Sequence, residues 1–95
     1  MTVHAPKDRM LDLVISQVNF GLAYAREARI AYESARREYG DLARDIADKA
    51  YAAAVRFAAK APNGIDLPTS KKIEELETEL YALWRTQEAH ALAIA

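Results

Sequence analysis

The longest segment between strong helix-stop signals covers residues 6–39 and reads PKDRMLDLVISQVNFGLAYAREARIAYESARREY. Pro6 suits the first turn of a helix, because the amide hydrogen that proline lacks would have no partner there. The next stop signal is Gly40, since glycine is common as the left-handed residue that ends a helix. The segment therefore predicts one long helix over residues 6–39, which at about 1.5 Å per residue would measure roughly 50 Å.

Apolar and small residues recur along this helix at alternating spacings of three and four. Such spacing is typical of a heptad seam on which a neighbouring helix packs. The middle of the seam consists of small side chains, which predicts a close approach of that neighbour. The seam comprises Leu11, Val14, Val18, Gly21, Ala25, Ala28, Tyr32, Ala35 and Tyr39.

A second helix is expected over residues 42–61. Asp41 directly follows Gly40 and suits an N-cap, because its carboxylate can accept hydrogen bonds from the first free amides of a helix. The acidic residues Asp41, Asp45 and Asp48 lie early in this segment, where they favour the positive end of the helix dipole. The stripe expected to face the core comprises Leu42, Ile46, Ala50, Ala53 and Phe57.

A third helix is expected over residues 70–93, after a Pro-Asn-Gly sequence that stops the second. Either Thr69 or Ser70 could cap it. Its apolar residues lie within one face about 100° wide, which predicts a one-sided amphipathic helix with Leu80 and Trp84 at the centre of the buried face. Gln87 lies inside this apolar face, where burial would demand a hydrogen-bond partner.

The composition agrees with an all-α fold. The chain has 95 residues, 52% of them hydrophobic, with three glycines, three prolines and no cysteine. The length is that of one domain, residues 1–95, and short connections make successive helices antiparallel neighbours. The fold predicted is an all-α, three-helix up-down-up bundle with an overlong first helix.

The charge pattern argues against several classes of partner. The net charge is -1, so no global field attracts nucleic acid or an acidic membrane surface. The longest uncharged run covers residues 13–25 and is too short to cross a bilayer. The arginines from Arg26 to Arg44 are the one basic concentration, and Glu33 stands four residues from both Arg29 and Arg37, which predicts an exposed ladder of ion pairs. We expect a cytoplasmic protein with no nucleic-acid or membrane partner.

The first half of the first helix is apolar on two faces. Leu13, Phe20 and Tyr24 cluster almost opposite the heptad seam when residues are placed at 100° intervals. One interpretation is that the second and third helices clasp the first from both sides and bury all of it. The other is that these three residues form the interface of a homo-oligomer, for which a two-fold dimer is the commonest closed form.

Residues with catalytic or ligand-binding chemistry are few. The two histidines, His4 and His90, are far apart in sequence, and the Glu-x-x-His repeats of di-iron helical bundles are absent. The glycines do not form a phosphate-binding loop. The sequence therefore predicts no metal site, no cofactor and no enzymatic activity.

Two stretches resemble known families. Ala47, Tyr51 and Ala54, after the turn at Gly40, resemble the second helix of a tetratricopeptide-type hairpin, which would imply a peptide-binding or scaffolding role. Arg85 and His90, with four residues between them, resemble the catalytic pair of HEPN-type nucleases, in which an alanine-rich and tyrosine-containing helix often comes earlier, like residues 50–53 here. The family usually has Asn, Asp or His after the arginine, where this chain has Thr86, and the predicted fold would lack one of the family's helices.

The function predicted is that of a small non-enzymatic α-helical interaction module, self-associating as a dimer through the first helix and open to a protein partner. The interface residues are Leu13, Phe20 and Tyr24. The alternative is an enzyme, a HEPN-like ribonuclease or a toxin-antitoxin component that uses Arg85 and His90.

Overall fold

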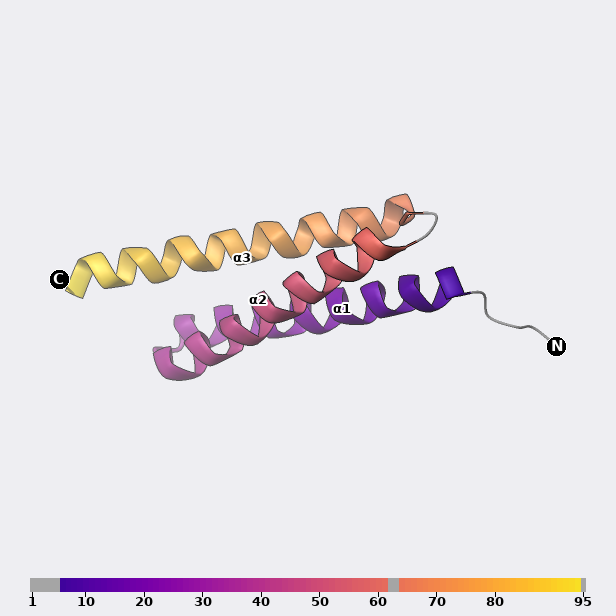
Figure 1. Cartoon of the computed structure of the whole chain (residues 1–95). Helices are drawn as coiled ribbons and strands as arrows, with labels where there is room; N and C mark the ends of the chain where they lie inside the picture. The colour runs from indigo at the N-terminus through magenta and orange to yellow at the C-terminus, as the bar shows by residue number, and fades with distance from the viewer. Residues whose placement is uncertain (1–5, 62–63, 95) are drawn as a thin grey trace.

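The structure is a computed structural model that describes the backbone of residues 6–61 and 64–94 and the side chains of residues 9–61, 64–86 and 88. Three helices, α1 (Pro6–Glu33), α2 (Arg37–Lys60) and α3 (Leu67–Ile94), run up, down and up along a molecule of 58 × 20 × 17 Å (Figure 1). The described residues contain no strand. The prediction of an all-α, three-helix up-down-up bundle is confirmed, although α1, with 28 residues, is no longer than α3.

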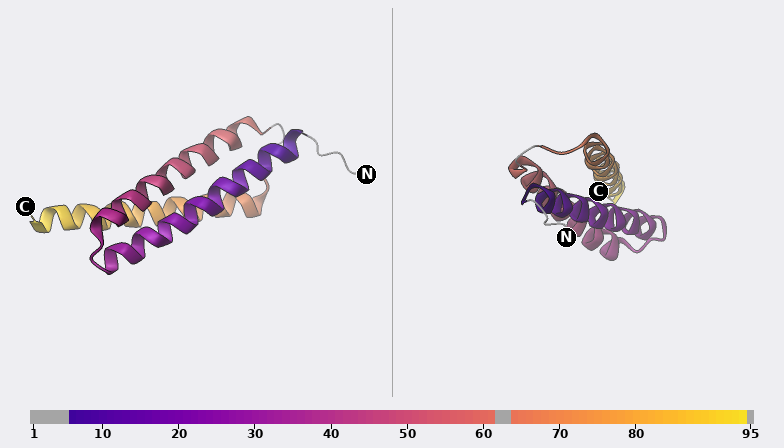
Figure 2. Two further views of the ribbon diagram at one scale, coloured as in Figure 1. Left: turned by 90° about the horizontal axis from the view of Figure 1, so that it is seen from below. Right: turned by 90° about the vertical axis from the view of Figure 1, so that its right-hand side faces the viewer.

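The helices α1 and α2 form a close hairpin, and α3 lies across it at an angle (Figure 2). Contacts between α1 and α2 are much more extensive than those of α3 with either helix. The predicted seam of α1 faces the interior of the molecule, because Val14, Val18, Ala25 and Ala28 are all buried. The prediction of a close approach is also confirmed: a Cβ atom added at Gly21 would lie 2.7 Å from a methyl carbon of Leu76 in α3.

The stripe of α2 predicted to face the core is wrong, because the buried residues lie part of a helical turn away from it. Leu42 is 55% exposed, and the buried residues of α2 are Gly40, Ala43, Ala47, Ala50 and Ala54. The middle of the α1 seam is made of small residues, so an alanine face on α2 brings the two helices closest together. The larger side chains of α2 are thereby displaced to the flanks of the contact.

The expected boundary at Gly40 is also wrong. The first helix ends at Glu33 and the second begins at Arg37, so Gly40 lies inside α2 and is buried there. The left-handed residue of the turn is Ala35, with φ 59°. Position 40 instead requires a residue without a side chain, because the ring of Tyr32 lies against it. A tertiary contact therefore accounts for this glycine, and Asp41, one residue later, is not an N-cap.

The third helix begins at Leu67, earlier than expected. Asp66 caps it, because its Oδ1 accepts a hydrogen bond from the Thr69 amide at 2.9 Å. Hydrogen bonds from the side chain and from the backbone of Thr69 lower the pKa of Asp66, since they stabilise its ionised form. Pro68 lies in the first turn, where proline is tolerated. The expectation that Thr69 or Ser70 provides the cap is therefore wrong, and the N-terminal boundary moves to Leu67.

The buried face of α3 is narrower than predicted. Leu76 and Leu83 are buried against the hairpin, and Leu80 packs beside them. Trp84 is 47% exposed and lies 5.9 Å from the ring of Tyr81, which is 60% exposed. Trp84 is therefore not a core residue, because α3 contacts the hairpin along a strip that Trp84 only borders. The side chain of Gln87 lies outside the described residues.

Candidate interaction surface

The three residues predicted to form an interface lie on an apolar face of α1 that α2 and α3 do not fully cover. Phe20 is 49% exposed and Leu13 is 37% exposed, while Tyr24 is half-buried. The ring centroids of Phe20 and Tyr24 are 4.8 Å apart, with the planes inclined at 51°. The interpretation that the other two helices bury this face completely is therefore wrong for Leu13 and Phe20.

The packing of the hairpin explains why this face stays open. Because α1 and α2 approach closely where Gly21 faces Ala50, the contact has no room for a bulky side chain, and Phe20 lies outside it, about 100° around the helix from Gly21. The helix α3 occupies the opposite flank of α1, where Arg29 pairs with Glu79 at 3.2 Å. The apolar face of α1 is thus a consequence of where the small residues lie.

A polar edge closes the face toward the α1–α2 turn. The hydroxyl of Tyr39 in α2 donates a hydrogen bond to Glu27 Oε1 at 3.2 Å, and the guanidinium of Arg36 lies 4.9 Å from the centre of the Tyr39 ring. Desolvation, together with the charge and hydrogen bond of Glu27, raises the pKa of Tyr39. The aromatic pair on α1 is therefore bordered by hydrogen-bonding groups, which is the usual composition of an interface rim.

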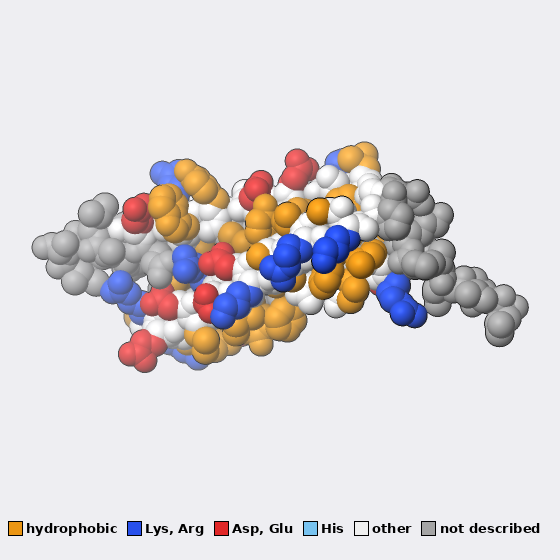
Figure 3. Space-filling model, in the orientation of Figure 1, with side chains coloured by type: hydrophobic (Ala, Val, Ile, Leu, Met, Phe, Trp, Pro, Cys, Tyr) orange, Lys and Arg blue, Asp and Glu red, His pale blue; other side chains and the backbone are white. Residues whose placement is uncertain are grey.

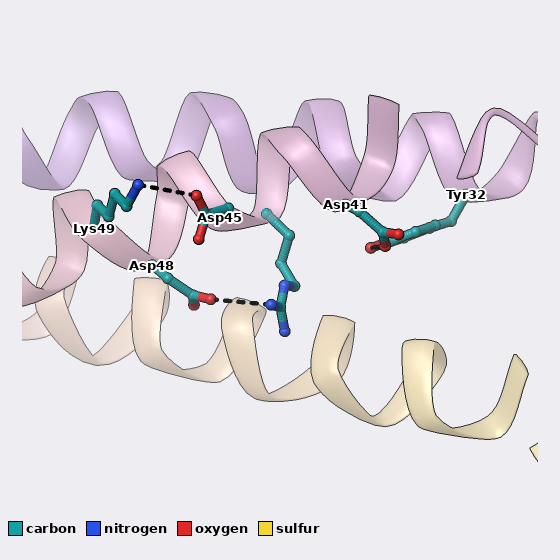
Figure 4. Close-up of polar contacts among 6 residues, drawn as sticks. Tyr32, Asp41, Asp45, Asp48 and Lys49 are labelled. Atoms are coloured by element: carbon teal, nitrogen blue, oxygen red, sulfur yellow. Dashed lines mark hydrogen bonds and ion pairs between the residues drawn. The ribbon is translucent and has the colours of Figure 1, made fainter. Parts of the chain in front are cut away.

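The acidic residues of α2 have structural partners. Asp41 accepts a hydrogen bond from the Tyr32 hydroxyl at 2.6 Å. Asp45 pairs with Lys49 at 3.1 Å, and Figure 4 shows the two side chains pointing toward one another. Asp48 lies 3.6 Å from Arg44, and its burial raises the pKa of its carboxyl group. The Tyr32–Asp41 hydrogen bond joins α1 to α2, whereas the two ion pairs lie within α2. The helix-dipole match that the sequence predicts for these three acids does not include their side-chain partners.

The expected ion-pair ladder on the first helix does not form as predicted. Arg29 pairs across to Glu79 of α3. Glu33 is the last residue of α1 and Arg37 the first of α2, so the two are not neighbours on one continuous helix. The turn between the helices therefore breaks the spacing on which that prediction depended.

The proposed nuclease pair lies on one unbroken helix. Arg85 is exposed on α3, and the side chain of His90 lies outside the described residues. Five residues along a regular helix correspond to about 500°, which places positions 85 and 90 about 140° apart. The backbone of α3 therefore directs the two positions to different sides of one helix.

Two hollows lie between α1 and α3. One, of about 260 Å³, is lined by Ile15, Val18, Asn19, Pro68, Thr69 and Lys72. The other, of about 310 Å³, is lined by Arg29, Tyr32, Glu33, Leu83 and Thr86. Neither lining contains the pair of carboxylates that general acid-base hydrolysis of a glycoside uses. Among the described residues, no three histidine or acidic side chains cluster as metal ligands would.

Comparison of the chain with protein-family models, curated proteins and solved structures finds no significant match. Within the described part of the chain, no helix is both long enough and apolar enough to span a membrane. What the surface can do follows from its own chemistry. It offers half-exposed aromatic and aliphatic groups on a rigid helix, with hydrogen-bonding groups at one edge.

Proposed function

We propose that the protein is a small α-helical interaction module that self-associates through α1, with Leu13, Phe20 and Tyr24 in the interface. The observation that carries the proposal is the exposure of Phe20, 49%, in a helix that two others already pack against. Burying a phenylalanine side chain stabilises a contact by roughly 1.5–3 kcal/mol. Because Phe20 is 49% exposed in the single chain, about half of this free energy remains available to a second chain that covers the face.

A second copy is the simplest partner for this face. Two copies that meet through a two-fold axis bring the same residues together, so each Phe20–Tyr24 pair can pack against the other. Tyrosine and phenylalanine are enriched in the centres of interfaces, and the Tyr39–Glu27 hydrogen bond would lie at the rim. The protein works, in this proposal, as a non-enzymatic homodimer.

Phe20→Glu tests the proposal against a matched control. A carboxylate that must be buried without a partner is costly, so we expect the substitution to weaken self-association by at least about a hundredfold. Ile30→Glu is the control, because Ile30 is 46% exposed on the same helix but lies about 80° around it from Phe20. Its assembly mass in light scattering should equal that of the unaltered protein, and circular dichroism should show that both variants remain helical.

Two results would contradict the proposal. A wild-type mass of 10.6 kDa at every concentration would mean that the chain does not self-associate. An unchanged mass for Phe20→Glu would place the interface elsewhere. Cleavage of RNA that both Arg85→Ala and His90→Ala abolish would instead support the nuclease alternative.

A further inference from the structure

The outward face of α3 carries a stripe of six exposed residues that the fold does not use. They lie at the alternating spacing of three and four that forms a heptad seam, and at 100° per residue they fall within an arc of about 100°. Leu76 and Leu83, which are buried against the hairpin, lie on the opposite side of the helix. The α3 stripe comprises Lys71, Glu74, Thr78, Tyr81, Arg85 and Glu88.

The order of charges along the α3 stripe is self-complementary. From its start the stripe reads basic, acidic, neutral, aromatic, basic and acidic. If a second α3 lies antiparallel over it, Lys71 of each copy faces Glu88 of the other, and Glu74 faces Arg85. In a parallel arrangement every charge would instead face its own like charge, which is destabilising. The pattern therefore favours one orientation.

The charges of the stripe are available for such a contact. In the part of the chain that the structure describes, the ion pairs are Arg29–Glu79, Arg44–Asp48 and Lys49–Asp45, and none involves the stripe. Thr78 donates its hydroxyl hydrogen to the carbonyl oxygen of Glu74 within α3, which leaves the Glu74 carboxylate uninvolved.

The centre of the stripe is its apolar part. Tyr81 is 60% exposed, and Trp84, which flanks the stripe, is 47% exposed and in contact range of the Tyr81 ring. Figure 3 shows basic, acidic and hydrophobic side chains following one another along the upper edge of the molecule, which α3 forms. An aromatic centre between charged ends is the arrangement in which a helix pair gains both apolar burial and a defined register.

We propose that α3 forms a second, antiparallel two-fold contact with α3 of another copy, in which Arg85 faces Glu74 and Lys71 faces Glu88. This contact uses a different helix from the α1 face and does not depend on it. Because each chain then has two self-complementary faces, the assembly extends beyond a dimer, either as a closed tetramer or as a linear array.

Charge reversal tests the pairing. Glu74→Arg and Arg85→Glu each replace two attractive contacts of the two-fold pair by two repulsive ones, so each should weaken the α3 contact by at least about tenfold. The double variant Glu74→Arg/Arg85→Glu restores opposite charges and should bring the affinity back to within about threefold of the original. Glu75→Arg is the matched control, because it makes the same change one residue away and off the stripe.

The measurement is sedimentation equilibrium at several concentrations, in the unaltered chain and in the Phe20→Glu background. We expect Phe20→Glu alone and Arg85→Glu alone each to leave a dimer, and the combination to be monomeric and still helical. Failure of the double charge variant to recover association would overturn the α3 contact. So would a Phe20→Glu protein that is monomeric at high micromolar concentration. Neither result affects the α1 proposal, which fails when Phe20→Glu leaves the assembly unchanged.

Discussion

The ring of Tyr32 lies directly against Gly40, so that a Cβ atom added to the glycine would be 2.6 Å from Tyr32 Cε1. The two residues stand on either side of the α1–α2 turn and fix how the hairpin closes. The same tyrosine donates its hydroxyl hydrogen to Asp41, one residue further along α2. One side chain of α1 therefore contacts α2 through both its ring and its hydroxyl group.

We expect Gly40→Ala to destabilise the protein, although alanine normally favours a helix interior by up to about 1 kcal/mol over glycine. The added methyl group overlaps the Tyr32 ring, and such overpacking typically costs about 1–3 kcal/mol. Urea unfolding followed by circular dichroism gives the change. Adding Tyr32→Leu should recover part of the loss, whereas a stabilising Gly40→Ala would contradict the contact.

Tyr32→Phe should alter how stability depends on alkaline pH. Burial first, then the hydrogen bond to the Asp41 carboxylate, raises the pKa of Tyr32 above its ordinary value of 10.0. The unfolded chain therefore releases this proton at lower pH than the folded chain does. The resulting stabilisation is present below about pH 10 and is lost as the pH rises above it. The unfolding free energy should fall less steeply there in Tyr32→Phe, and equal slopes would argue against the shift.

Leu76→Ala and Trp84→Ala should differ strongly in their effect on stability. Leu76 is fully buried against Gly21, so its truncation should cost about 2–5 kcal/mol. Trp84 is half exposed, and its loss should cost less than about 1 kcal/mol. Urea denaturation of both variants is the measurement, and equal losses would mean that α3 docks in another rotation.

Asp66→Ala should lower the melting temperature by a few degrees at neutral pH, because the α3 cap is lost. The pKa of Asp66 is lowered in the fold, so its contribution is present above the unfolded pKa, about 3.9, and disappears as the pH falls through the lower folded value. The difference from the unaltered protein should therefore shrink in acid. Asp66→Asn keeps a capping oxygen and should melt closer to the unaltered protein at neutral pH.

The periodicity of the sequence sufficed for the fold class and for the number of helices, because amphipathic spacing survives in the packed structure. The helix boundary predicted at Gly40 was wrong, since glycine serves both as a helix-stop signal and as the smallest residue that fits beneath an aromatic ring. The turn itself uses Ala35 in a left-handed conformation, for which the sequence carries no signal. The exposed positions of Leu13 and Phe20 were predictable because their side of α1 was apolar and unassigned. The partners of Asp41 and Asp48 were not, since they depend on the rotation of α2.

The unequal packing of the three helices implies an order of folding. Contacts between α1 and α2 are the most extensive and join segments adjacent in the chain, so the hairpin closes at a smaller loss of chain entropy than the docking of α3 requires. The helix α3 then adds through Leu76, Leu83 and a few polar contacts. In native-state hydrogen exchange, we therefore expect the amides of α3 to open at lower free energy than those at the centre of α1 and α2. The helix that docks last during folding is therefore also the first that we expect to unfold locally.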